Sequence, residues 1–180
     1  MNLKAKNEMK GKHKMNNEIY KALKSVFEII RAAHLVLPLQ STLEIYHHYG
    51  VERFNETGAV FINVVNKEYC KSYAVILPGQ VYPTHYHKIK QETFYVLYGD
   101  LVVTRDGSRH TLRPGEMLDV ERGEEHSFFS TTGAVFEEIS TTYVRNDSVY
   151  IDQKISGATY EQRKTFVTYA EWEEMKKDGE

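Results

Sequence analysis

Two histidines separated by one residue mark the segment PTHYHKIKQETFYVLYG, residues 83–99. Side chains alternate across a strand, so His85 and His87 point to one face and Tyr86 to the other. Glu92 follows in the next β-rich run, five residues after His87. If the two runs pair as neighbouring strands, we expect the two imidazoles and the carboxylate to converge.

A fourth donor of the same kind is His126, which follows the turn-like segment ERGEE and opens another β-rich run. Three imidazoles and one carboxylate suit Mn, Fe, Ni, Co or Zn. An octahedral ion would keep two positions for water or substrate, whereas four protein ligands would close a structural zinc site. Four clustered donors have little structural use unless they bind a metal. We interpret the other histidines as structural: His13, His34, His47, His48 and His110.

Two adjacent glutamates, Glu137 and Glu138, lie in the middle of the β-rich run AVFEEISTTY. Period-2 geometry sends one of them into the interior, where an unpaired carboxylate costs several kcal/mol. The inward glutamate is therefore a candidate general base, or else one half of a structural salt bridge. Parity does not say which of the two points inward. Lys90 lies two residues before Glu92, and we place it near the rim of the site.

The elements that position these side chains are short. After Gly58 the chain consists of β-rich runs separated by Gly, Pro, Asp and Asn, with no long helix between them. This pattern is typical of an antiparallel sandwich or barrel. Asp106-Gly107 is a hairpin signal between two of the runs. We predict an all-β fold, a single domain whose antiparallel β-barrel spans residues 46–157.

Helical additions are expected at both ends of the barrel. Residues 1–45 should hold a lysine-rich, mobile tail up to Asn17 and an amphipathic helix from Ile19 to Ala33 that ends by Leu37-Pro38. Ser41 and Glu44 form a capping-box pattern, which predicts a short helix over residues 42–49. Residues 158–180 should form an extension in which Thr168 and Glu171 cap a helix carrying Trp172.

Composition excludes some classes of function. Among 180 residues the formal net charge is −2, which gives no bias toward nucleic acid or a membrane. Cys70 is the only cysteine, so no intrachain disulfide can form, and we interpret it as a small buried residue. With no apparent signal peptide, we expect a cytoplasmic protein.

The spacing of the first motif, from Gly79 through His85, His87 and Glu92 to Gly99, resembles the first motif of the cupin superfamily at every position. Gly115, Gly123 and His126 resemble the second motif. Two positions there depart from the family pattern: Glu121 stands where proline is usual, and Ser130 where asparagine is usual. The resemblance implies a cupin-type jelly roll that binds a metal.

Within the cupins, KQETF at residues 90–94 and EEISTT at residues 137–142 resemble the D-lyxose isomerase group. That resemblance implies a manganese enzyme, with Co²⁺, Ni²⁺, Fe²⁺ or Zn²⁺ as other candidate ions. It would interconvert D-lyxose and D-xylulose, and D-mannose and D-fructose, through a cis-enediol. It makes Glu138 the proton-transferring base and Lys90 its partner. The metal ligands implied are His85, His87, Glu92 and His126.

Other classes stay open. The segment STTYVRNDSVYID also resembles cupin segments of sialic-acid-synthase-like proteins, which favours a metal-bound sugar-recognition module without turnover. An oxidative cupin would use the same metal in a strongly apolar pocket, and a metal-free epimerase would not need the four donors. No phosphate-binding glycine loop or arginine cluster is evident, which favours a free monosaccharide. We expect a homodimer that covers an exposed sheet edge, with Ile19–Ala33 as a candidate for that contact.

Overall fold

The computed structural model describes the backbone of residues 3–179 and the side chains of residues 17–177. Its helices are α1 (Leu3–Ala32), the 3-10 helix η1 (Val51–Arg53), α2 (Gln153–Ser156), α3 (Tyr160–Arg163) and α4 (Tyr169–Gly179). Its strands are β1 (Thr42–Tyr46), β2 (Ala59–Asn66), β3 (Tyr69–Ile76), β4 (Val81–His87), β5 (Glu92–Tyr98), β6 (Leu101–Arg105), β7 (Ser108–Leu112), β8 (Met117–Val120), β9 (His126–Phe129), β10 (Ala134–Thr141), β11 (Ser148–Tyr150) and β12 (Lys164–Thr168).

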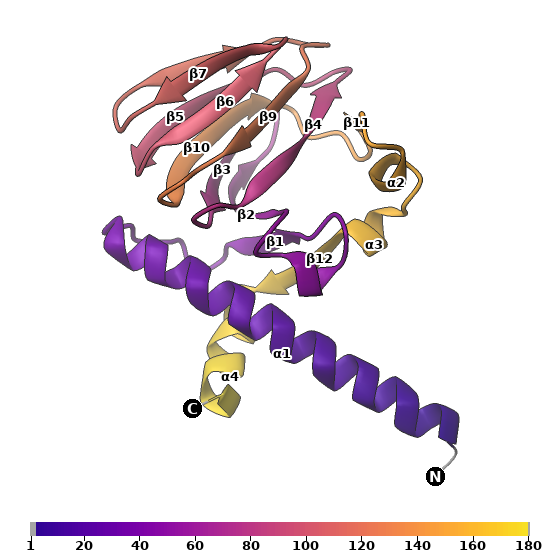
Figure 1. The fold of residues 1–180 in the computed structure, drawn as a ribbon. Helices are drawn as coiled ribbons and strands as arrows, with labels where there is room; N and C mark the ends of the chain where they lie inside the picture. Colours follow the sequence, from indigo (N-terminus) through magenta and orange to yellow (C-terminus); the bar gives the residue numbers. More distant parts are fainter. Residues whose placement is uncertain (1–2, 180) are drawn as a thin grey trace.

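Two antiparallel sheets form the body of the molecule (Figure 1). One has seven strands in the order β12-β1-β2-β3-β10-β5-β8, and the other has five in the order β11-β4-β9-β6-β7. The prediction of an all-β fold with helices at both ends is confirmed. The larger sheet includes β1 and β12, so it extends beyond the predicted barrel bounds of 46–157.

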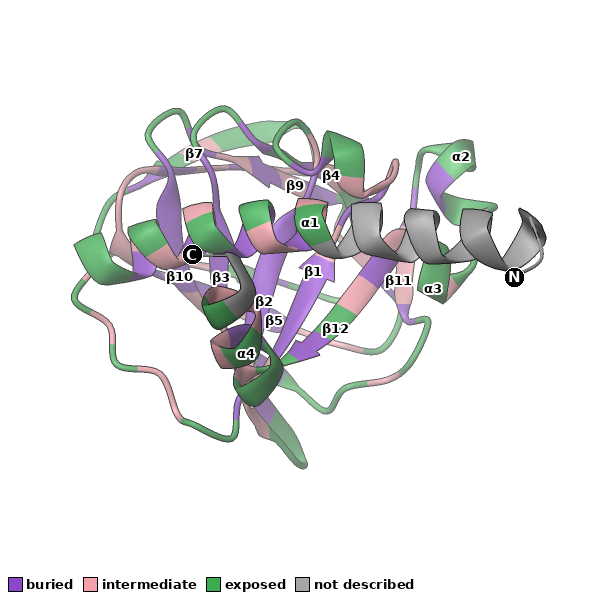
Figure 2. Ribbon diagram, turned by 90° about the horizontal axis from the view of Figure 1, so that it is seen from below, coloured by how far each residue is buried: buried purple, intermediate pink, exposed green. Residues whose placement is uncertain are grey.

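Alternating side chains give the seven-stranded sheet two buried faces. Its inner face packs against the five-stranded sheet, where the aromatic rings of Phe94, Phe128 and Phe136 meet. Its outer face is covered by α1, through residues such as Leu23 and Val26 (Figure 2). Each large side chain that is fully buried in this way contributes about 1.5–3 kcal/mol. The apolar clusters on the two faces of this sheet therefore stabilise the barrel.

Turn chemistry confirms the predicted hairpin between β6 and β7. Asp106 and Gly107 both have positive φ, 45° and 77°, which is what a two-residue I′ turn requires. Gly99, which closes the first motif, has φ 70°, and a Cβ there would lie 2.0 Å from the carbonyl oxygen of Gly133. Only glycine fits that position, so the motif glycine has a steric cause.

The predicted helix over residues 42–49 is wrong, because Thr42–Tyr46 forms strand β1. Leu43 and Ile45 are fully buried beneath α1, whereas Glu44 and Tyr46 line the barrel interior. This period of two outweighs the capping-box pattern, which depends only on residues close together in the sequence. The correction brings Glu44 into the interior.

The N-terminal helix is longer than predicted. The chain is helical from Leu3, so the helix includes the segment for which a lysine-rich tail was predicted, while side chains up to residue 16, including His13, lie outside the described part. The helix ends at Ala32, before the predicted Leu37-Pro38, and His34 follows with φ 53°. Among the described helices, none is long and apolar enough to cross a lipid bilayer.

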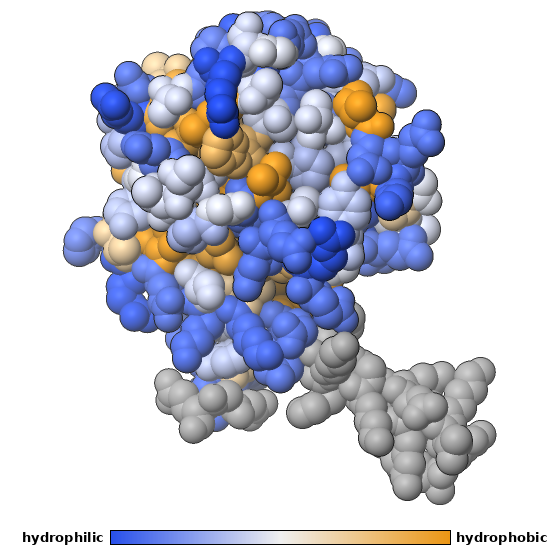
Figure 3. All heavy atoms as spheres, viewed as in Figure 1, coloured by the Kyte–Doolittle hydropathy of each residue, from blue (hydrophilic) through white to orange (hydrophobic). Residues whose placement is uncertain are grey.

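The apolar face of α1 is already used within the chain, against β3, β10 and α4. Trp172 of α4 stacks on Phe27 with ring centroids 4.7 Å apart. Thr168 and Glu171 cap α4 reciprocally, as predicted. The apolar face of the Ile19–Ala33 segment therefore covers the outer sheet face of its own chain rather than an edge in a dimer. On the side drawn in Figure 3, hydrophilic residues dominate and hydrophobic ones form small separate areas.

Candidate metal centre

Strand register brings the three predicted histidine ligands together. His85 of β4 lies directly opposite His126 of β9, with ring centroids 4.2 Å apart. His87 is two residues further along β4, on the same face. One nitrogen from each of the three rings lies within 4.8 Å of the others, and all three side chains are buried. The group could hold a divalent metal ion.

Glu92 reaches the same point from the other sheet. It begins β5, which pairs with β10 and β8 and not with β4, so the two motif segments are not neighbouring strands. The side chains converge across the barrel interior instead. One oxygen of the Glu92 carboxylate lies 3.3 Å from Nε2 of His87, and the other lies 3.2 Å from Nε2 of His126.

Each imidazole is oriented by a contact on its other nitrogen. Nδ1 of His85 bonds the carbonyl oxygen of Pro83, and Nδ1 of His126 bonds that of Glu124, both at 3.0 Å. A carbonyl only accepts, so Nδ1 carries the proton and Nε2 keeps its lone pair for a metal. Nδ1 of His87 lies 3.5 Å from Asp147, a residue that the motif spacing did not bring to attention.

Asp147 also holds the loop that follows His87. Its carboxylate accepts backbone N–H bonds from Lys88, Ile89 and Lys90 at 2.9–3.1 Å. These bonds fix the loop between β4 and β5, and hence the relative positions of His87 and the loop lysine. A polar side chain in a long β10–β11 connection gave no sequence signal for this role.

The donors present fit a divalent cation. Nε2 of His126 and Oε2 of Glu92 are buried and lack hydrogen-bond partners among the described residues, although they lie 3.2 Å apart. Adjacent ligands of an octahedral ion lie about 3 Å apart when each is about 2.1 Å from the ion. A bound cation would satisfy both atoms, which otherwise each cost free energy in the fold. An uncharged amide side chain in place of Glu92 would hold a cation less tightly.

The protonation states of His85 and Glu92 also suit ligation, whereas Glu92 overcomes the effect of burial and raises the pKa of His126. Burial lowers the pKa of His85 well below its ordinary value, and the neighbouring imidazoles His126 and His87 add to that shift. Burial opposes the ionisation of Glu92, but Lys90 and His87 overcome it and hold the pKa of that carboxyl well below its usual range. A neutral imidazole and an ionised carboxylate are the forms that bind metals.

A lysine and two glutamates adjoin the metal donors. Lys90 lines the pocket with its side chain half-buried, and its ammonium contacts both Glu92 and Glu138, the latter at 2.9 Å. The adjacent glutamates face opposite ways. Glu137 pairs with Lys71 at 2.7 Å outside the pocket, while Glu138 lines the pocket. The ambiguity left by strand parity is resolved in favour of Glu138.

The surroundings raise the pKa of both Glu138 and Lys90. Burial, followed by repulsion from Glu92, raises the pKa of Glu138 to about 7, against the partial opposition of Lys90. Burial opposes the charge on Lys90, but Glu138 and Glu92 together raise its pKa above the ordinary value. A carboxyl that titrates near neutrality can both accept and return a proton, as a general base must.

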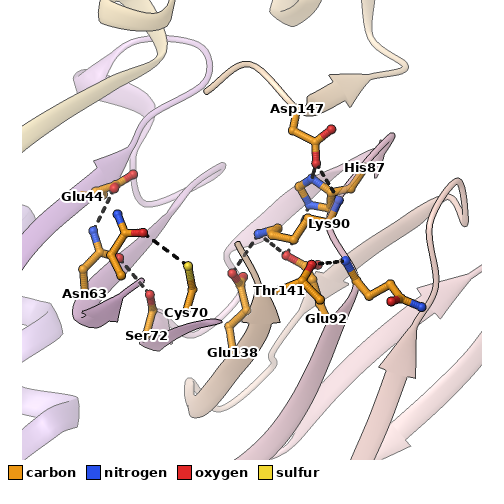
Figure 4. Close-up of polar contacts among 12 residues, drawn as sticks. Glu44, Asn63, Cys70, Ser72, His87, Lys90, Glu92, Glu138, Thr141 and Asp147 are labelled. Atoms are coloured by element: carbon orange, nitrogen blue, oxygen red, sulfur yellow. Dashed lines mark hydrogen bonds and ion pairs between the residues drawn. The ribbon is translucent and has the colours of Figure 1, made fainter. Parts of the chain in front are cut away.

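The same pocket has a second polar wall that motif spacing did not reveal. Figure 4 separates the two groups: Lys90, Glu138, His87 and Glu92 on one side, and Glu44, Asn63, Ser72 and Cys70 on the other. Cys70 is buried, as predicted, and its thiol donates weakly to Asn66 at 3.4 Å.

Comparisons with known proteins agree with this fold. Residues 72–142 match the cupin domain family model. The L-ribose isomerase of Geodermatophilus obscurus superposes with a TM-score of 0.65 at 14% identity, over 78% of this chain and 94% of that one. An L-ribose isomerase variant from an Acinetobacter species, in complex with L-ribose, gives 0.65 at 11% identity, over 83% and 96%.

The L-ribose isomerase of Cellulomonas parahominis, solved with L-ribose, gives a TM-score of 0.61 at 14% identity, over 78% of this chain and 93% of that one. No curated protein sequence matches the chain. At these identities the likeness concerns the fold. The two antiparallel sheets, the cupin domain match and these neighbours identify the fold as a cupin jelly roll.

Proposed function

We propose that this cupin is a metal-dependent aldose–ketose isomerase that moves a proton between C1 and C2 of an open-chain monosaccharide. The observation that carries the proposal is the pairing of Glu138 with Lys90 at 2.9 Å, beside the three buried histidines in one pocket. An isolated metal site needs no such pair, whereas isomerisation needs a group that accepts a proton and gives it back.

A divalent ion held by His85, His87, Glu92 and His126 would stabilise the negative charge that develops on the adjacent sugar oxygens. The chain's own residues would do the rest. Glu138 takes the proton from C2 of the aldose and returns it to C1, so the carboxyl ends as it began. One hydroxyl proton passes from O2 to O1 in the same overall change. The Lys90 ammonium, fixed by Glu92 and Glu138, is the donor available to those oxygens.

The proposed substrates are D-lyxose, giving D-xylulose, and D-mannose, giving D-fructose. The L-ribose of the structural neighbours shares with both aldoses the same configuration at C2 and C3. A single base on one side of the pocket removes the C2 proton from one face only, so this shared configuration is the feature that Glu138 would select. We propose manganese as the ion, on the basis of the resemblance to D-lyxose isomerases.

Two observations favour turnover over the alternatives. An oxidative cupin was expected to have an apolar pocket without an inward glutamate, but Glu44 and Glu138 both line this pocket. A recognition module would keep the metal donors and would have no use for a base with a pKa raised to about 7 by burial and Glu92.

The test uses metal-stripped protein reloaded with manganese and incubated separately with L-ribose, D-lyxose, D-mannose and D-xylose. D-xylose is the matched control, because it differs from D-lyxose only at C2 and would give the same ketose. We expect ketose from one or more of the first three sugars, much slower turnover of D-xylose, and no turnover without metal. If manganese-loaded protein converts none of the first three, the proposal is wrong.

A further inference from the structure

The strands that follow β10 in the seven-stranded sheet, β3, β2, β1 and β12, carry a row of hydrogen-bonded polar side chains. Glu138 of β10 lies opposite Ser72 of β3, and Ser72 lies opposite Asn63 of β2. Ser72 Oγ donates to Asn63 Oδ1, and Asn63 Nδ2 donates to Glu44 Oε1, both at 2.8 Å. The row ends at Lys164, whose Nζ donates to Glu44 Oε2 at 2.8 Å.

This row begins at Ser72, on the strand next to Glu138, and leads away from the proposed base along the pocket lining (Figure 4). Neighbouring strands are about 4.8 Å apart, so Asn63 lies two strand spacings from Glu138. That is the length scale of a five- or six-carbon open chain with its hydroxyls. A sugar whose C1 and C2 meet Glu138 would therefore extend its remote hydroxyls along Ser72 and Asn63.

The atoms along the row suit hydroxyl groups. The hydroxyl of Ser72 donates its hydrogen bond to Asn63, so its oxygen can still accept one. The amide of Asn63 has one further N–H that can donate. A sugar hydroxyl both donates and accepts, so it can bridge such neighbours. The polar groups are themselves buried or nearly so and already oriented, which lowers the entropy cost of binding.

The charge of the pocket selects against an anionic ligand. Its described lining contains four carboxylates, Glu44, Glu92, Glu138 and Asp147, against one lysine, Lys90. When these groups are ionised and a divalent cation is bound, four negative charges face three positive ones, a net charge of −1. The ammonium of Lys164 pairs with Glu44 and with the hydroxyl of Tyr46, each at 2.8 Å, and so neutralises Glu44. The pocket therefore has no excess positive charge that would attract a phosphate group.

We propose that Glu44, Asn63 and Ser72 form the subsite for the end of the sugar remote from the reacting carbons, and that the substrate is an unphosphorylated aldose. This inference rests on the proposed function for its chemistry, but it can be tested by binding alone. The ion pair of Glu44 with Lys164 also joins β1 to β12, so the test must separate a structural effect from a loss of binding.

The ligand for the test is the pentitol made by reducing D-lyxose, which cannot isomerise, together with its terminal phosphate ester. Calorimetric titration of manganese-loaded protein should give weaker binding of the phosphate ester by about ten-fold or more. Ser72→Ala leaves the Glu44–Lys164 pair intact and should weaken pentitol binding about three- to ten-fold, the effect of one hydrogen bond. Its thermal stability should change little.

Thr93→Ala is the matched control, since Thr93 is a strand hydroxyl outside the pocket lining that bonds Asp119. It should bind the pentitol as the unaltered protein does. Glu44→Gln combined with Lys164→Met removes the carboxylate without leaving a buried unpaired ammonium, and should narrow the preference for the neutral pentitol.

The subsite is overturned if manganese-loaded protein does not bind the pentitol, if the phosphate ester binds as tightly, or if folded Ser72→Ala binds normally. Sugar turnover that is insensitive to Ser72→Ala in KM would refute the subsite and leave the isomerase standing. Pentitol binding that depends on Ser72, with no turnover of any aldose, would refute the isomerase and leave the subsite standing.

Discussion

Replacing Glu138 by glutamine separates the proposed base from a structural salt bridge. The amide has nearly the same shape and can still accept the hydrogen bond that Lys90 donates at 2.9 Å. It cannot accept a proton from C2. Loss of a general base lowers kcat about 10²- to 10⁴-fold, which corresponds to about 2.7–5.4 kcal/mol of barrier. We expect KM and the manganese content to change little, because Glu138 is not among the proposed metal ligands.

The same substitution should make the metal-free protein more stable at high pH. Burial and Glu92 raise the pKa of Glu138 from 4.5 to about 7, so the folded state holds a proton that the unfolded state releases in this range. Stability is therefore lost as pH rises from about 4.5 to about 7. Glutamine removes that loss. The two proteins should be similarly stable below pH 4.5, and the variant should be more stable above pH 7.

Urea unfolding at pH 5 and pH 8, alongside steady-state kinetics, measures both effects. A variant that keeps most of its kcat would refute the role given to Glu138. A variant that loses stability at pH 8 together with activity would indicate that the carboxylate holds the fold through Lys90, as a salt bridge would. Glu137→Gln is the control, since Glu137 pairs with Lys71 outside the pocket and should leave kcat unchanged.

Three further outcomes follow from the site and the sheet edges. His126→Gln should reduce bound manganese from one ion per chain to a small fraction by elemental analysis, whereas His110→Gln, outside the pocket lining, should keep it; equal loss in both would contradict the ligand assignment. Lys90→Met leaves Glu92 and Glu138 buried without their cation, so the metal-free protein should lose about 3–5 kcal/mol in urea unfolding. The loss should be smaller with manganese, and an equal loss in both forms would count against a shared Glu92. Light scattering at micromolar concentration should give the mass of a dimer, and a monomeric mass would exclude it.

Those features of the site that depend on local spacing could be predicted from the sequence. His85 and His87 share a face because side chains alternate, and the spacing to Glu92 and His126 matches a known motif, so the four donors could be named without coordinates. Their actual meeting depends on the pairing of β4 with β9 and on two sheets facing each other, which are contacts between distant segments. For that reason the sequence could indicate that the four side chains meet, but not which strands pair to bring them together.

The far wall of the pocket was out of reach of sequence reasoning. Ser41 and Glu44 satisfy a helix-capping pattern locally, and only the burial of Leu43 and Ile45 under α1 makes the segment a strand. Lys164, which pairs with Glu44, lies 120 residues away in the chain. Local patterns hold no information about such a partner, since the tertiary fold decides both the secondary structure and the charge pairing.

The central claim is a proton transfer carried out by a side chain of this pocket. Manganese-loaded protein incubated with D-lyxose in deuterated water, followed by proton NMR, tests it most directly. The account predicts D-xylulose with solvent deuterium at C1, because the proton taken from C2 exchanges on Glu138 before it is returned. Ketose formed without deuterium, or no ketose from protein that holds manganese, would contradict it.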